Sequence, residues 1–153
     1  LAEDMLKVAR TKARKYRTAQ FVCGNALRLP FEKASFDIVT MGFGIRNVQN
    51  IEKAISEIFR VLKPKGRVLI LEFSLPTNAF LKKAYLLYLR YFLPKIGGFF
   101  SKSDTSYSYL NKTIEAFPYG EKFVQYLNNA GFKHTEALPI MGGIVSLYKG
   151  DKC

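Results

Sequence analysis

The sequence predicts an α/β fold in which a helix crosses between two parallel strands. Three successive segments carry this prediction: the mostly apolar run 36–42, a helix that begins after Asn50, and the fully apolar run 67–73. Asn50 is suited to cap the helix, and its apolar positions follow the 3.6-residue period at 51, 54, 55, 58, 59 and 62. Strand, helix and strand with short connections form a right-handed crossover unit. An apolar strand such as 36–42 is typical of a parallel sheet covered on both faces.

The run from residue 60 to 74 is the most informative single stretch. It reads Arg-Val-Leu-Lys-Pro-Lys-Gly-Arg-Val-Leu-Ile-Leu-Glu-Phe-Ser. We expect the helix to stop at Pro64 and Gly66, and the strand that follows to end on Glu72 and Ser74. Ligands of open parallel sheets gather where the strands end at their carboxyl edge. The run therefore predicts both a fold class and the place of a site.

The remaining elements are predicted from shorter patterns. The sequence predicts an amphipathic helix over 2–16, a short strand over 20–24, helices over 78–93, 106–116 and 121–130, and a β-hairpin from strands 132–138 and 143–149. Gly131 is expected to end the last helix in the left-handed conformation. The hairpin is expected to close one edge of the sheet.

Composition limits the range of functions. A chain of 153 residues is one domain long, and its 24 basic and 12 acidic residues give a net charge of +12. Such a charge suits either nucleic acid or an anionic membrane face. Cys23 and Cys153 form neither a disulfide framework nor a metal spacing, which fits a reducing compartment. The chain starts at Leu1, inside a helical pattern and without a signal peptide, so we expect it to be the interior of a longer protein.

Several polar residues follow the predicted strands. Gly42 and Gly44 allow a close backbone approach to a ligand, and Arg46 is either a charge presented at the carboxyl edge or a surface residue. Asn25 either bonds a heterocycle or fills a turn position, and locally the turn is favoured. Glu72 either faces a pocket or pairs with an arginine for structure, and we favour the structural pairing.

A set of motifs occurs in order along nearly the whole chain: Gly24-Asn25-Ala26, Leu29-Pro30-Phe31, Ser35-Phe36-Asp37, Phe43-Gly44-Ile45-Arg46-Asn47-Val48, the 60–74 run, Tyr109-Leu110, Phe117-Pro118, Ala130-Gly131-Phe132 and Gly142-Gly143-Ile144-Val145. In combination they resemble the C-terminal two-thirds of the quinone-biosynthesis C-methyltransferases, the demethylmenaquinone and 2-polyprenyl-6-methoxybenzoquinol methyltransferase family. Two positions depart from the family pattern. Lys65 replaces a usual glycine or methionine, and Gly42 stands where relatives often carry serine.

The resemblance implies a class I, Rossmann-like, S-adenosylmethionine-dependent fold with a C-terminal antiparallel hairpin, here lacking the first two strands. It implies one partial domain over 1–153, with a helical quinone- or membrane-facing insertion at about 76–118. Asn25 and Ala26 would line the adenine of the cofactor, and Gly42 and Phe43 would lie near it. Arg46 would stabilise the phenolate that makes a quinol ring carbon nucleophilic, or hold a water that takes the proton, because arginine is itself a poor base.

Partners follow from the same resemblance. The substrate would be a polyprenyl quinol, for which Tyr107 and Tyr109 either line a pocket or simply pack. The apolar helix over 80–93 is too short to span a bilayer and is either buried or interfacial. The interfacial alternative implies an anionic membrane surface and a cytoplasmic protein bound to the inner face, and a homo-oligomer stays open. We expect neither nucleic-acid binding, since the aromatic residues lie in apolar helices, nor a metal.

One expected feature is missing from the sequence. Nothing in the 153 residues resembles a G-x-G-x-x-G turn. We therefore expect weak cofactor binding and a poorly stable sheet, in which strand 20–24 lacks its neighbour. A non-catalytic protein that binds quinone or membrane is the alternative function.

Overall fold

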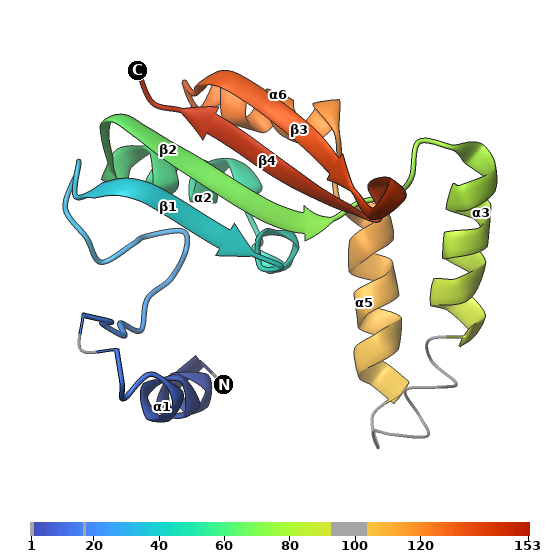
Figure 1. Ribbon diagram of the computed structural model, residues 1–153, viewed down its shortest axis with the longest axis horizontal. Helices are drawn as coiled ribbons and strands as arrows, with labels where there is room; N and C mark the ends of the chain where they lie inside the picture. The colour runs from blue at the N-terminus through green and yellow to red at the C-terminus, as the bar shows by residue number, and fades with distance from the viewer. Residues whose placement is uncertain (1, 17, 93–103) are drawn as a thin grey trace.

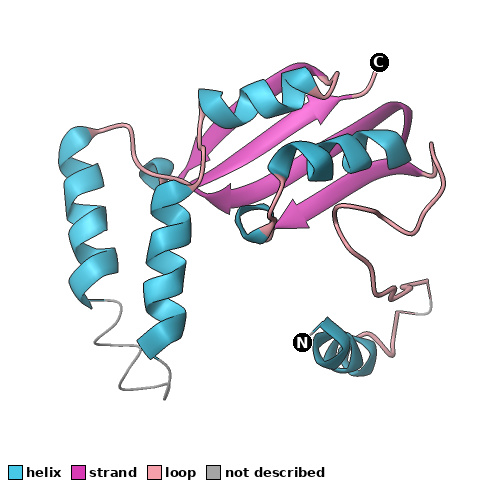
Figure 2. Ribbon diagram, turned by 180° about the vertical axis from the view of Figure 1, so that it is seen from behind, coloured by secondary structure: helices cyan, strands magenta, loops and turns pink. Residues whose placement is uncertain are grey.

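The computed structural model describes residues 2–16, 18–92 and 104–153. In chain order the elements are α1 (Ala2–Lys12), β1 (Phe36–Gly42), η1 (Ile45–Asn47), α2 (Ile51–Val61), β2 (Leu62–Phe73), α3 (Ala79–Leu87), the π-helix η2 (Tyr88–Phe92), α5 (Asp104–Ala116), α6 (Glu121–Asn129), β3 (Lys133–Ile140), η3 (Met141–Gly143) and β4 (Val145–Asp151). Helices α2 and α6 cover one face of the sheet, α3 and α5 extend side by side from one end of it, and α1 lies apart (Figures 1 and 2).

The sheet has the strand order β1-β2-β4-β3. β1 pairs with β2 in parallel, which confirms the predicted crossover. β4 is antiparallel to both β2 and β3, so the predicted hairpin is confirmed and closes one edge. The core lies between the sheet and the two helices on its covered face, and Tyr148, Phe123 and Phe132 are its largest fully buried side chains.

The helix before the central strand forms as predicted but ends earlier. The Asn50 side chain accepts a hydrogen bond from the amide of Lys53, as expected of an N-cap. The expected stop at Pro64 and Gly66 is wrong, because α2 ends at Val61 and β2 begins at Leu62. Pro64 lies instead where the register between β1 and β2 shifts, so its missing amide costs the ladder little.

The irregular first part of β2 places different constraints on Lys65 and Gly66. Lys65 has a φ of +66°, a conformation that is unfavourable for a residue with a Cβ. A Cβ on Gly66 would lie 2.9 Å from the carbonyl oxygens of Asp37 and Lys63. Gly66 is therefore required by close backbone contacts, whereas Lys65 occupies a position where glycine would be less strained.

Two expectations about the sheet are wrong. Residues 20–24 form no strand, because no strand lies beside them among the described residues to complete a ladder. β1 is covered by helices on one face only in the described part of the chain (Figure 2), and Ile38 is 59% exposed. β1 also lies at the end of the strand order, so its outer edge is unpaired there.

The helices differ slightly from the predicted bounds. The first helix is shorter than 2–16, and the fourth begins at Asp104 instead of 106. The predicted helix 78–93 is α3 capped by Asn78 and followed by η2, while residue 93 lies outside the described residues. Gly131 has a φ of +100°, as predicted for a left-handed helix end.

Candidate functional site

The carboxyl ends of the two parallel strands lie side by side. Gly42 of β1 is opposite Leu71 of β2, and the amide of Phe43 donates to the carbonyl of Leu71 at 2.8 Å. The chain then turns through Phe43, whose φ is +53°, into the short helix η1. This turn brings Arg46 back over the end of β2, where Glu72 and Phe73 lie.

Arg46 and Glu72 form a buried ion pair. Nη1 of Arg46 lies 2.6 Å from Oε1 of Glu72, and the two side chains are 11% and 0% exposed. The carboxylate also accepts from the amide of Phe73 at 2.9 Å and from the amide of Arg46 at 3.3 Å. The structural pairing favoured for Glu72 is therefore confirmed. It fixes the position of the guanidinium that the sequence proposed for catalysis.

The ion pair with Glu72 engages only some of the N–H donors of the Arg46 guanidinium. Nη1 also donates to the carbonyl of Phe43 at 2.8 Å. Nε of Arg46 is buried and has no hydrogen-bond partner among the described residues. Because a guanidinium carries five N–H donors, further donors can serve a ligand.

The ring of Phe73 lies against the arginine, and the ring of Phe43 packs on that of Phe73. The ring of Phe73 is 5.2 Å from the guanidinium carbon and 4.8 Å from the ring of Phe43. Phe43 is 40% exposed. The site thus combines a fixed cation with an aromatic surface on which a planar ring can stack.

Phe73 also lines an apolar cavity of about 530 Å³. The cavity lies between the α3–η2 segment and α5, and its other lining residues are Leu81, Ala84, Tyr85, Tyr88, Leu89, Leu110, Ile114 and Ile144. Burial raises the pKa of the Tyr85 phenol, so its hydroxyl stays neutral. A cavity of this size and polarity suits a small apolar ligand.

The two tyrosines proposed for substrate binding both belong to α5. The hydroxyl of Tyr109 donates to Oδ1 of Asn47 at 3.1 Å, which ties α5 to the residue after Arg46. Tyr109 does not line the apolar cavity, whereas its neighbour Leu110 does. The side chain of Tyr107 lies outside the described residues. Sequence reasoning missed Phe73 and Leu110, because their apolar patterns are equally typical of a core.

The Asn25–Ala26 turn lies in the loop that precedes β1. Oδ1 of Asn25 accepts from the amide of Leu27 at 2.9 Å, so the side-chain oxygen closes a turn. Within the described part of the chain this turn makes no hydrogen bond to Gly42, Phe43 or Arg46. The structure therefore does not bring all the proposed cofactor residues into one contact group, and their shared role stays a prediction.

An ion pair between Glu57 and Arg60 of α2 holds the loop that follows this turn. Glu57 and Arg60 form two hydrogen bonds of 2.7 and 2.9 Å. Glu57 accepts from the amide of Leu29, and Arg60 donates to the carbonyls of Leu29 and Phe31. The hydrogen bond from Arg60 lowers the pKa of Glu57 from 4.5 to about 2. The sequence offered one signal for this pair, an acid and a base three residues apart on a helix.

The backbone of Gly42 is open at the carboxyl edge of β1. A Cβ placed on Gly42 would meet no atom within 4 Å. A serine side chain would therefore fit at this position without a clash, and the backbone there is open to a ligand. The edge of β1 thus fits the approach of a nucleoside-type cofactor from the end of the sheet.

Solved structures with a similar arrangement of strands and helices indicate the class of fold to which this chain belongs. A methyltransferase from Thermotoga maritima matches 94% of this chain and 69% of its own chain, with a TM-score of 0.61 and 22% identity. A second from Aquifex aeolicus matches 99% and 65%, with a TM-score of 0.63 and 14% identity. Both are SAM-dependent methyltransferases, so the protein has the α/β fold of that class.

Sequence comparison narrows the class to one family. The chain belongs to the ubiE/COQ5 methyltransferase family, whose model matches residues 1–152. A demethylmenaquinone methyltransferase from Chlorobaculum tepidum is 44% identical over 92% of this chain, and a ubiquinone/menaquinone biosynthesis C-methyltransferase UbiE from Cronobacter sakazakii is 42% identical over 98%. The chain spans 57% and 61% of the length of these two relatives.

Proposed function

We propose that the protein takes part in S-adenosylmethionine-dependent C-methylation of the ring of a polyprenylated quinol. The observation that carries this proposal is the position of the Arg46 guanidinium. It lies against Phe73, and Phe73 also lines the apolar cavity. A quinol ring over Phe73 would have its oxygen near the arginine and its apolar side chain toward the cavity. The family membership supports the same reaction class.

The carboxyl edge of β1 would hold the cofactor. Gly42 and Phe43 would contact it there, and Asn25 with Ala26 would line its adenine, as the family resemblance implies. S-adenosylmethionine, when bound, supplies the electrophilic methyl group. The chain's own contribution is to orient the ring against that edge, since holding two reactants in line can provide much of the rate enhancement.

Arg46 would act on the ring oxygen. Removal of the phenol proton raises electron density on the adjacent ring carbon, so the site must stabilise the negative charge that develops on the oxygen. Glu72 already compensates the arginine charge, and donors not engaged by Glu72 or Phe43 would hydrogen-bond the phenolate. A water held by the same guanidinium would accept the proton, because arginine remains protonated at neutral pH.

This chain, which spans about three fifths of its relatives' length, would supply the contacts to the quinol ring. A further strand would pair with the free edge of β1, which ends the sheet among the described residues.

The protein would also associate peripherally with the inner face of the cytoplasmic membrane, where polyprenyl quinols reside. None of the described helices is long and apolar enough to cross it.

Methyl transfer tests the proposal directly. The protein is incubated with S-adenosylmethionine labelled on the methyl group and with naphthoquinol or 6-methoxybenzoquinol substrates that lack the ring methyl group and carry two isoprene units. We expect label in the quinol fraction, with a requirement for high cofactor concentration because the chain carries no glycine-rich turn. Arg46→Lys should lower transfer by about 10²-fold, because lysine cannot keep the same donor geometry.

A specific outcome would favour the alternative function. Quinone binding without any methyl transfer, even at saturating cofactor, would indicate a non-catalytic protein that binds quinone or membrane. Binding to oligonucleotides with a steep salt dependence would instead indicate a nucleic-acid partner.

A further inference from the structure

The continuous α3–η2 segment carries an exposed apolar stripe. Phe80, Leu87 and Tyr91 are 84%, 46% and 60% exposed, and the exposed Ala84 lies between them. The spacing of Phe80, Ala84 and Leu87 places them on one side of α3, and Tyr91 follows them in the π-helix η2. Monomeric proteins rarely leave such large side chains grouped in water, so this side of α3 is suited to contact an apolar phase.

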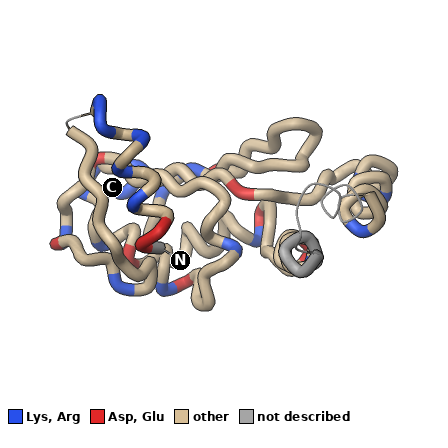
Figure 3. The backbone as a smooth tube through the Cα atoms, turned by 90° about the horizontal axis from the view of Figure 1, so that it is seen from below, with Lys and Arg blue, Asp and Glu red and all other residues tan. Residues whose placement is uncertain are grey.

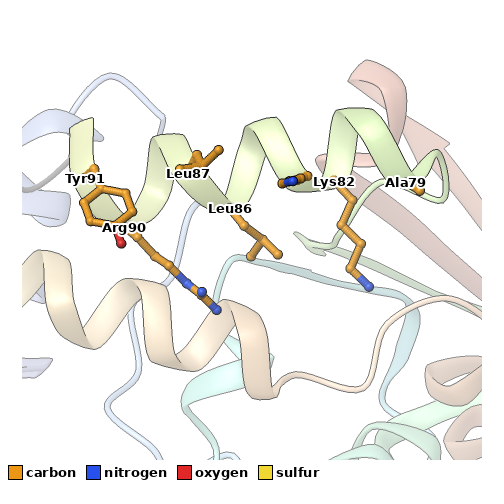
Figure 4. A pocket seen from close by; sticks show the side chains of 7 residues that line it. Ala79, Lys82, Leu86, Leu87, Arg90 and Tyr91 are labelled. Carbon is orange, nitrogen blue, oxygen red and sulfur yellow. The ribbon is translucent and has the colours of Figure 1, made fainter.

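A basic groove runs along one border of the stripe. The groove has a volume of about 430 Å³ and is lined by Ala79, Lys82, Lys83, Leu86, Leu87, Arg90 and Tyr91 (Figure 4). Arg90 forms two hydrogen bonds with Glu115 of α5, and among the described residues Lys82 donates only to the hydroxyl of Tyr119. The groove therefore keeps the positive charges of Lys82 and Lys83, and no acidic residue occurs between 73 and 103. Figure 3 looks nearly along the axis of α3, at the right of the view, and shows blue on one side of this helix.

The other border of the stripe meets the apolar cavity. Ala84, Leu81 and Tyr88 line the cavity and are themselves exposed, whereas Tyr85 and Leu89 form its buried wall. Ala84 thus belongs both to the stripe and to the cavity lining. Exposed residues of α3 and η2 thus line one part of the cavity, and Phe73, whose ring lies against Arg46, lines another part.

We infer that α3 lies in the surface of an anionic membrane, and that the side chain of a lipid-borne quinol passes beside Ala84 and Tyr88 into the cavity. This inference rests on the proposed function and adds the route of the substrate. Apolar residues on one side of a helix and lysines along its border are the pattern of an interfacial helix, with lysine ammonium groups at the level of the lipid headgroups. The quinol ring then reaches Phe73 and Arg46 without leaving apolar surroundings.

Vesicle binding tests the membrane contact. Phe80→Asp with Leu87→Asp adds two negative charges to the stripe, and Met5→Asp with Val8→Asp adds the same charge to exposed apolar positions of α1. On vesicles of phosphatidylcholine and phosphatidylglycerol we expect the α3 variant to lose about tenfold or more in partitioning, and the α1 variant to lose little. Equal losses in the two variants, or unchanged binding of the α3 variant, would overturn the inference.

Two matched substitutions of alanine by phenylalanine test the route of the quinol side chain. Ala84→Phe fills the opening, whereas Ala79→Phe makes the same change on the groove side of α3, outside the cavity lining. Binding is measured by calorimetry with 1,4-naphthoquinone and with the same ring carrying a two-isoprene side chain. We expect Ala84→Phe to weaken only the prenylated compound, by about tenfold, and Ala79→Phe to change neither.

The outcomes separate the inference from the function on which it rests. If the wild-type protein binds neither quinone, the proposed function fails. If it binds both equally, or if Ala84→Phe leaves the prenylated compound unaffected, the route is wrong while quinone recognition stands. Circular dichroism and the binding of the unprenylated ring check that Ala84→Phe remains folded.

Discussion

Because Arg46 and Glu72 form a buried ion pair, replacing Glu72 should lower the free energy of unfolding more than replacing Arg46 does. Glu72→Leu leaves the guanidinium, only 11% exposed, without its counter-charge. Breaking a buried pair in this way costs about 3–5 kcal/mol. Arg46→Met should cost less, about 2–3 kcal/mol, because Glu72 keeps two backbone amide donors, those of Phe73 and of residue 46.

The double variant should recover most of this loss. Arg46→Met with Glu72→Leu places two apolar side chains where a charge pair was, which is often close to neutral. We expect its stability within about 1 kcal/mol of the wild type, and therefore a coupling energy of at least about 4 kcal/mol. Urea unfolding followed by far-ultraviolet circular dichroism gives all four free energies. Strictly additive effects, or single variants as stable as the wild type, would refute a buried, coupled pair.

Two further predictions concern stability. Lys65→Gly should stabilise the protein by about 1 kcal/mol, raising Tm by about 3 °C, because it relieves a φ of +66°. Gly66→Ala should lower Tm by several degrees, since its Cβ would overlap two carbonyl oxygens; melting curves with both changes in the same direction would contradict this reasoning. The pKa of Glu57, about 2 in the folded protein and 4.5 unperturbed, means that its bond with Arg60 stabilises the fold above pH 4.5 and is lost as pH falls toward 2. Glu57→Gln should therefore flatten the decline of Tm across that pH range, and an unchanged slope would show that the pair contributes nothing.

Local patterns in the sequence were enough to predict the central unit of the fold. The Asn50 cap, the apolar period of the helix after it and the uninterrupted strand are properties of adjacent residues, and the structure confirms each. The pairing of Glu72 with an arginine also followed from its place at a strand end. These features depend on short-range geometry, which a sequence carries directly.

Other features depend on neighbours that are distant in the chain. The segment 20–24 has a strand-like composition, yet it forms no ladder because no partner strand lies beside it among the described residues. Phe73 acquires its importance from contacts with Phe43, Arg46 and a cavity built by two later helices. Its sequence context shows only an apolar strand, so no local pattern could have singled it out.

A titration followed by NMR tests the central claim most directly. At 17.4 kDa the protein is suited to amide and side-chain spectra, and the ligand is a naphthoquinol carrying two isoprene units. The account predicts that the signals of Arg46, Phe43 and Phe73 shift first and together, along with that of Leu110 in the cavity. Shifts confined to α1 or the outer strand β3, or no shifts at all, would contradict the proposal that this edge of the sheet binds the quinol ring.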